Sequence, residues 1–396
     1  MTSRFHIMHD PRFRLVHQVT QRFSDGPDGG QIRLARTGFT LDPAIKKKAE
    51  VYPAMLIATH PAPDTGNLYS PVRGVVSDVS ERYVDIDVKP AQPDDPVMPV
   101  VDLSSLEGDA LLEGLKNMGV DTRSLSQSVD TLIINALNPE PGIMWAEPML
   151  ATHVRNLKLG LELHQRISKA HKVIIALPKG MNAAYEGLEV AHIEPEYPNS
   201  LDPLVIKAIT GKENPPGVGI VGLHALWGLG RVMVTGQPLT ETVVTVASCC
   251  HTGNYIIKDG TRVCDLFEHA NVTVEKGDTV VVGGPLRGQS ISLLARGLDK
   301  HTTGVFVVEA DSIPPLDGDS QCVNCGACAL VCPARLAPDM LSRYAEFAKY
   351  DRCRAGHIEA CMECGLCGYV CIARRPVLQY IRLAKHKLAL EDNRLA

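Results

Sequence analysis

The sequence lacks any uninterrupted apolar stretch of about eighteen residues, the length that a helix needs to cross a membrane. The most apolar region, residues 218–234, is interrupted by glycines and by His224. Residues 1–14 are polar and rich in His and Arg, without the apolar core of a secretory signal. We therefore expect a cytoplasmic chain that does not span a membrane.

The sequence also lacks a large excess of charge. Its 396 residues have a formal net charge of −5, and no basic block marks a surface for nucleic acid. Nucleic acid is therefore excluded as a partner. A hydrophobic content of 45% allows two or more cores, and the length indicates two to four domains.

Cysteine is abundant by contrast, and eight of the twelve cysteines form two runs near the C-terminus. The first run reads Cys322-x2-Cys325-x2-Cys328-x3-Cys332-Pro333, and the second reads Cys361-x2-Cys364-x2-Cys367-x3-Cys371. This spacing is typical of thiolates around a cubane iron–sulfur cluster. It lets successive sulfurs point into one small cavity while backbone N–H groups turn toward the cluster. The sequence therefore predicts two [4Fe–4S] clusters and one-electron transfer.

In two-cluster ferredoxins the fourth cysteine of each run ligates the other cluster. On this rule Cys322, Cys325, Cys328 and Cys371 hold cluster 1, and Cys332, Cys361, Cys364 and Cys367 hold cluster 2. The alternative is a pair of zinc sites, but zinc normally takes two ligands from each of two separated knuckles, whereas four cysteines crowd each run here. Electron transfer needs no general acid or nucleophile, so we assign no catalytic residue. Eight thiolates that bind clusters, and four other cysteines at irregular spacing, also argue against an oxidising compartment.

The order of expected elements indicates a multidomain α+β protein with four units. Residues 1–95 form a β-rich domain, because the apolar runs at 54–58, 74–76 and 83–88 are separated by Pro and Gly turns. Residues 89–101 are rich in Pro and Asp and form a linker.

Residues 103–238 alternate between helical and strand patterns, which implies an α/β domain with a parallel sheet. We expect helices at 106–118 and 149–170 and strands at 131–135 and 173–177. Residues 239–300 give the order hairpin, helix and strand of a β-grasp domain. Residues 315–390 hold the cysteine runs, and the helical patterns after Pro338 and after Pro376 indicate an α-helical ferredoxin. The basic face of the last helix either packs on its own domain or docks a partner.

Ligands of parallel sheets bind at the carboxyl ends of the strands. This rule selects the loop 135–145 and the loop after Leu177. Glu140 lies between two prolines and is a rigidly held carboxylate. It is a candidate for a nucleotide or flavin site, and the alternative is a residue that fixes its loop without a ligand.

Several segments resemble the RnfC family, whose members are subunits of the Rnf ion-translocating ferredoxin:NAD oxidoreductase. The resemblance covers nearly the whole chain. The segments that resemble this family are 69–76, 129–135, 245–260, 277–288 and 379–385. The resemblance implies a barrel-sandwich domain, an α/β domain like the flavoprotein of respiratory complex I that binds flavin and NADH, a soluble-ligand-binding β-grasp (SLBB-like) domain and a dicluster ferredoxin. It further implies a peripheral protein at the cytoplasmic face of the inner membrane. Its partners would be integral-membrane and peripheral subunits and a soluble carrier such as ferredoxin.

The sequence departs from this family at the glycine-rich loop that precedes the strand at 131–135. That place reads Asn-Met-Gly-Val-Asp-Thr-Arg-Ser-Leu from residue 117 to residue 125, with Gly119 as its one glycine. Side chains there would crowd a phosphate, and the Asp121 carboxylate would repel it. The family's Gly-Gly-Glu after a Tyr-Pro pair also appears as Asn-Ser-Leu-Asp at 199–202, following Tyr197 and Pro198. We therefore expect that neither FMN nor NAD binds, and that Glu140 does not restore the site.

Three functions remain open. The first is an electron-transfer subunit of an Rnf-type translocase, and the second is a non-catalytic iron–sulfur relay or scaffold in another redox complex. The third is a soluble flavin-dependent reductase. A tightly bound flavin would separate the third from the second, and membrane association that requires other subunits would separate the first from the third.

Overall fold

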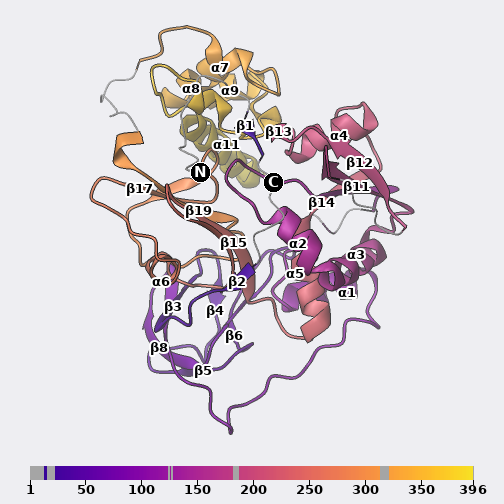
Figure 1. Cartoon of the computed structure of the whole chain (residues 1–396), viewed down its shortest axis with the longest axis vertical. Coiled ribbons are helices and arrows are strands. Elements are labelled where there is room, and N and C mark those ends of the chain that lie inside the picture. Colours follow the sequence, from indigo (N-terminus) through magenta and orange to yellow (C-terminus); the bar gives the residue numbers. More distant parts are fainter. Residues whose placement is uncertain are drawn as a thin grey trace.

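The computed structural model describes residues 13–15, 23–123, 125, 128–181, 187–312 and 321–395. It is a multidomain α+β protein with several sheets (Figure 1). The C-terminal helices, drawn in yellow and orange, gather at one end of the molecule, and the first β domain lies at the opposite end. Within these residues no helix is both long and apolar enough to cross a bilayer.

Two small sheets form the first β domain. One has the order β3 (Gln31–Ala35), β9 (Tyr83–Val88), β8 (Gly74–Val79), β5 (Glu50–Val51), and the other has the order β4 (Thr40–Leu41), β6 (Leu56–Thr59), β7 (Leu68–Tyr69). Side chains alternate as the sequence pattern predicts, because Ile32 and Leu34 are buried while Arg33 between them pairs with Asp85 at 2.7 Å. The expected linker has neither helix nor strand.

The α/β domain contains a four-stranded parallel sheet of order β12 (Glu189–Ile193), β11 (Lys172–Pro178), β10 (Thr131–Asn135), β14 (Val218–Gly222). The surrounding helices are α1 (Gly108–Asn117), α2 (Ala146–Thr152), α3 (Val154–Ser168), α4 (Asp202–Thr210) and α5 (Leu223–Thr235). The single helix expected at 149–170 is wrong, since α2 and α3 are separated at His153. His153 leaves the helical conformation, and its ring packs against Phe23 and Trp227.

The third unit is larger than the sequence indicates. Its sheet has the order β18 (Gln289–Ile291), β17 (Thr279–Val282), β19 (Gly304–Val308), β15 (Glu241–Ala247), β16 (Thr252–Lys258), β2 (Phe23–Asp25), and α6 (Val263–His269) follows β16. The boundary expected at residue 300 falls short, because β19 lies beyond it in the middle of the sheet. The boundary of the first unit also differs, since β2 belongs to this sheet and β1 (Phe13–Arg14) pairs with β13 (Glu196–Tyr197) beside the α/β domain.

The C-terminal module consists of α7 (Ala327–Leu330), α8 (Pro338–Glu346), α9 (Tyr350–Ala355), α10 (Leu366–Tyr369) and α11 (Val377–Leu395). Helix α8 begins at Pro338, as expected, and buries Leu341 and Ala345. Helix α11 buries an apolar stripe against the module. The stripe consists of Val377, Leu378, Ile381, Ala384 and Leu388.

Candidate metal centre

The two cysteine runs fold as two copies of one motif, 39 residues apart from Cys322 to Cys361. In each copy a residue with positive φ precedes the second cysteine, Asn324 (55°) in the first and Glu363 (53°) in the second. A glycine with positive φ follows that cysteine, and a short helix comes next, α7 or α10. A long helix, α8 or α11, closes each copy. The backbone therefore follows the same course around the cysteines in both copies.

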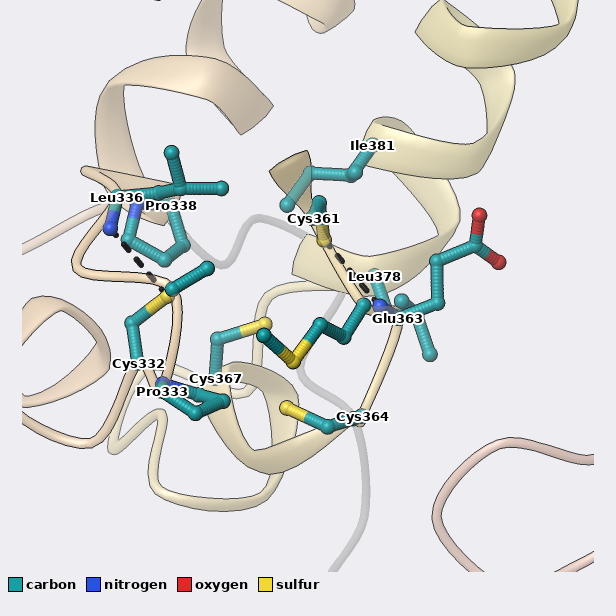
Figure 2. A pocket seen from close by; sticks show the side chains of 13 residues that line it. Cys332, Pro333, Leu336, Pro338, Cys361, Glu363, Cys364, Cys367, Leu378 and Ile381 are labelled. Carbon is teal, nitrogen blue, oxygen red and sulfur yellow. Dashed lines mark hydrogen bonds between the residues drawn. The ribbon is translucent and has the colours of Figure 1, made fainter. Parts of the chain in front are cut away.

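The first hollow is lined by three cysteines of the second run, Cys361, Cys364 and Cys367, together with Cys332 of the first run. Its empty volume is about 370 Å³. Figure 2 shows the four sulfurs turned toward this hollow, which has apolar walls. The apolar side chains include Leu336, Leu378 and Ile381.

The second hollow has the converse composition. Cys322, Cys325 and Cys328 of the first run line it together with Cys371 of the second, and its empty volume is about 380 Å³. The fold therefore brings the fourth cysteine of each run to the first three cysteines of the other.

Backbone donors and burial define the electrostatics of the first hollow. The N–H of Leu336 donates to Cys332 Sγ and the N–H of Glu363 donates to Cys361 Sγ, both at 3.4 Å (Figure 2). Burial and the neighbouring thiols raise the pKa of the Cys367 thiol to about 12. Without a cation in this cavity the thiols therefore stay protonated, whereas a bound iron–sulfur cluster would hold them as thiolates.

The residues that line the hollows are of the kind that a cubane needs. No group of three or more His, Cys, Asp or Glu side chains in the described part of the chain is arranged to hold a metal ion. A cubane differs because each thiolate binds a separate iron at a corner of the cube, so that the sulfurs stand around a hollow and not around a point. Four cysteine sulfurs, N–H donors to them and a dry wall are the parts that such a cluster needs.

Two cations on the basic face of α11, Arg382 and Lys385, pack on their own module, and Arg382 also donates to the Arg287 carbonyl at 2.8 Å. Arg382 and Lys385 bind the Glu363 carboxylate at 2.8 and 3.1 Å, and Lys385 Nζ also donates to the Cys361 carbonyl at 2.7 Å. Burial alone would raise the pKa of Glu363, but the two cations outweigh burial and the pKa is lowered. These ion pairs fix the loop between Cys361 and Cys364.

Glu140 lies at the contact between two domains. Its side chain is 4% exposed, and its Oε2 accepts the N–H groups of Leu286 at 3.1 Å and Arg287 at 3.0 Å. Burial raises the pKa of this carboxyl, although the two backbone hydrogen bonds act to lower it. The carboxylate also packs on Gly284. Glu140 thus joins the loop after β10 to the loop after β17.

Gly284→Ala is expected to destabilise this contact by about 1–3 kcal/mol, the usual cost of overpacking a buried site. A Cβ at Gly284 would lie 2.1 Å from the Glu140 carboxylate, and the loop would have to move. Thermal unfolding of the anaerobically purified protein measures the effect. Gly30→Ala is the matched control, because a Cβ there meets nothing within 4 Å. Equal melting temperatures for the two variants would contradict the expected close packing.

A third hollow opens at the carboxyl ends of β10 and β14, where parallel sheets bind ligands. Its empty volume is about 820 Å³. The expected loop 135–145 contributes four lining residues, whereas the described residues between Leu177 and Ser200 contribute none. Met362 of the cysteine motif also lines it, so this hollow reaches the loop that bears Cys361 and Cys364.

Polar groups in this third hollow are partly engaged. Asn135 Nδ2 donates to the Ser200 carbonyl at 2.8 Å and to Asp202 Oδ1 at 2.7 Å, while burial raises the pKa of Asp202. Among the described residues neither Trp145 Nε1 nor Arg287 Nε finds an acceptor. Arg287 and Met362 were not predicted from the sequence. Arg287 lies in the 277–288 segment and Met362 lies in the second cysteine run, and these two positions were the sequence signals that could have identified them.

The segment that replaces the glycine-rich loop connects α1 to β10 and therefore lies near the amino end of that strand. Its Asp121 carboxylate accepts the Gly66 N–H at 2.7 Å and pairs with His301 at 2.9 Å. Burial would raise the pKa of Asp121, but His301 and Lys300 outweigh burial and hold it at about 2. This segment ties the α/β domain to its two β neighbours, and the residues do not fit a phosphate cradle.

Comparison with known proteins found sequence relatives in several bacteria. No family model matches the chain. The chain is 32% identical over 285 residues to the C subunit of the ion-translocating oxidoreductase complex of Edwardsiella ictaluri, covering 67% of this chain and 36% of the relative. It is 33% identical over 303 residues to the protein of the same name from Erwinia tasmaniensis, covering 70% of this chain and 38% of the relative. The chain thus spans less than half the length of these relatives.

Among solved structures, an NAD+-reducing [NiFe]-hydrogenase in the H2-reduced state matches with a TM-score of 0.43 and 16% identity, covering 67% of this chain and 58% of the hydrogenase chain. The two relatives above and the protein from Salmonella arizonae share one description. Over about 70% of its length, this chain belongs to the family of C subunits of ion-translocating oxidoreductase complexes.

Proposed function

We propose that this chain is the electron-transfer subunit of an Rnf-type ion-translocating oxidoreductase and passes single electrons through two [4Fe–4S] clusters. One observation carries the proposal: two hollows that each combine three cysteines of one run with the fourth of the other. The family supports it, because the relatives are described as subunits of an ion-translocating oxidoreductase complex.

Cluster 1 is proposed to bind Cys322, Cys325, Cys328 and Cys371, and cluster 2 to bind Cys332, Cys361, Cys364 and Cys367. The clusters supply the one-electron chemistry. The protein supplies thiolates, the N–H donors of Leu336 and Glu363, and apolar walls, which together tune the potential.

The four units have proposed roles within this function. Residues 31–95 are proposed as a barrel-sandwich domain, 103–238 as a domain of the complex I flavoprotein fold, 239–300 with β2 and β19 as an SLBB-like β-grasp domain, and 315–390 as the ferredoxin domain. Support comes from the two small sheets, the parallel sheet, the mixed sheet with α6 and the cysteine motifs.

The chain is proposed to bind integral-membrane and peripheral subunits at the cytoplasmic face of the inner membrane, and to exchange electrons with a soluble carrier such as ferredoxin. The description of the relatives as subunits of a complex supports such partners. In its native cells the protein should sediment with membranes only when those partners are present. A soluble protein in cells that contain them would instead favour a relay in another complex.

Purified anaerobically, the chain is expected to carry about eight iron atoms and eight acid-labile sulfides per monomer, the content of two four-iron clusters. Elemental analysis by mass spectrometry and a colorimetric sulfide assay measure both. Dithionite should bleach the visible absorption of the clusters. Zinc in place of iron, at one or two atoms per chain, would refute the proposed function.

A further inference from the structure

The two copies of the cysteine motif differ in what covers them. In the second copy the face of the motif is buried against the rest of the chain. Tyr197 Oη donates to the Cys364 carbonyl at 2.7 Å, and the rings of Tyr369 and Phe13 lie 4.8 Å apart. A Cβ on Gly365 would lie 2.3 Å from the Leu286 carbonyl oxygen. The α/β domain, the loop after β17 and strand β1 therefore cover this face.

No described residue covers the same face of the first copy. Val323, 39 positions before Met362, is 60% exposed, and Leu330, 39 positions before Tyr369, is 87% exposed. Cys325 is exposed where its counterpart Cys364 is buried. A Cβ on Gly326 would meet nothing within 4 Å, whereas Gly365 is covered. We call the face formed by Val323, Cys325, Gly326 and Leu330 the bare face.

The bare face is apolar and has cations near it. Large apolar side chains at such exposure over a redox site mark an interaction surface. Between residues 321 and 338 the chain has no acidic residue, and its Arg335 is paired with Glu213 at 2.9 Å. Arg343 of α8 reaches the motif, and its Nη1 donates to Asn324 Oδ1 at 3.0 Å. A partner with an acidic rim around an apolar centre is complementary to this surface.

The covered face of the second copy indicates how the bare face is used. There, protein packs directly on the loop that bears Cys361 and Cys364, and a hollow of the α/β domain reaches Met362. The two copies share one backbone course, so an equivalent surface can pack on the first copy in the same manner. In the described chain, no residue does so.

We infer that the bare face docks a separate, acidic-rimmed redox protein, which exchanges electrons with cluster 1. This inference rests on the proposed function and adds the place and the chemistry of the partner. Cluster 2 is then the inner centre next to the α/β domain, and cluster 1 is the centre at the surface. The contact is of the small, short-lived kind common in electron transfer, with charge steering the encounter.

Stopped-flow reduction of the eight-iron protein by a photochemically reduced, acidic plant-type ferredoxin tests the inference. Leu330→Glu and Val323→Glu place a like charge in an apolar contact with an acidic partner, and each should lower the second-order rate constant about tenfold or more. The wild-type rate should also fall as salt rises, because salt screens the steering charges.

Leu293→Glu is the matched control, because Leu293 is an apolar side chain 58% exposed in the β-grasp unit, outside the ferredoxin module. It should leave the rate unchanged. Reduction by dithionite should be equal in all variants, which shows that the clusters are intact. If dithionite reduces no cluster in the wild type, the proposed function itself fails.

Two results would overturn the inference while leaving the proposed function in place. One is equal ferredoxin rates for Leu330→Glu, Leu293→Glu and the wild type. The other is a wild-type dimer in sedimentation equilibrium that dissociates in Leu330→Glu, which would assign the bare face to a second copy of this chain.

Discussion

Cys371→Ser is expected to remove the cluster built on the first cysteine run, although Cys371 belongs to the second. The side chain of Cys371 lines the hollow of Cys322, Cys325 and Cys328 and is absent from the residues that line the other hollow. Loss of one of four thiolates leaves an iron without its protein ligand. Iron should therefore fall from about eight to about four atoms per chain.

Electron paramagnetic resonance of the dithionite-reduced protein identifies which cluster is lost. Cys332→Ser should give the reciprocal result, so that the two variants retain different spectra, and Cys322→Ser should resemble Cys371→Ser. Cys353→Ser is the matched control, because Cys353 is buried in the same module but lines neither hollow. A Cys371→Ser spectrum that matches that of Cys361→Ser would show that each run ligates its own cluster.

Local signals in the sequence predicted local structure well. The strand expected at 131–135 is confirmed as β10, and the helix expected after Pro338 is confirmed as α8. Family membership is confirmed by the relatives. These features depend on periodicity, Pro and Gly punctuation or contiguous motifs, which a short window contains.

Long-range pairing could not be predicted in the same way. Strand β2 has three residues, and it joins a sheet whose other strands lie more than 200 positions later. Strand β19 enters the centre of that sheet after the expected boundary at residue 300. Nothing in a three-residue strand specifies its neighbour, because the pairing is selected by tertiary packing.

In the candidate site, too, local features could be predicted from the sequence and long-range contacts could not. Ligation of each cluster by both runs stays a prediction, and the positions of Cys332 and Cys371 support it. The surroundings of Glu140 could not be read from its loop, because its partners Leu286 and Arg287 lie about 146 positions away. The sequence left open whether Glu140 binds a ligand or fixes its loop, and its two backbone hydrogen bonds favour the second.

The isolated protein is expected to contain no stoichiometric FMN and to be reduced slowly by NADH. A pyrophosphate needs closely approaching backbone N–H groups, which glycine provides. Here Gly119 is the one glycine of the loop, and its carbonyl accepts Lys300 Nζ. The Asp121 carboxylate nearby already accepts the Gly66 N–H and pairs with His301 and Lys300, so a phosphate would have to displace it from these donors.

Arg123 is the residue in this loop that could still hold a phosphate, since a guanidinium can bind a phosphate with two hydrogen bonds. Its side chain is 77% exposed and pairs with Asp64 at 3.0 Å, so a phosphate would have to displace a carboxylate at a solvated site. Anaerobic calorimetry should therefore give dissociation constants for FMN and NADH weaker than about 1 mM. The visible absorption of the clusters should bleach with dithionite or reduced ferredoxin and stay unchanged on mixing with NADH. Micromolar binding with rapid bleaching by NADH would restore the flavin- and NADH-binding role that the family resemblance implies, whereas reduction by ferredoxin alone would leave a relay whose nucleotide site has been lost.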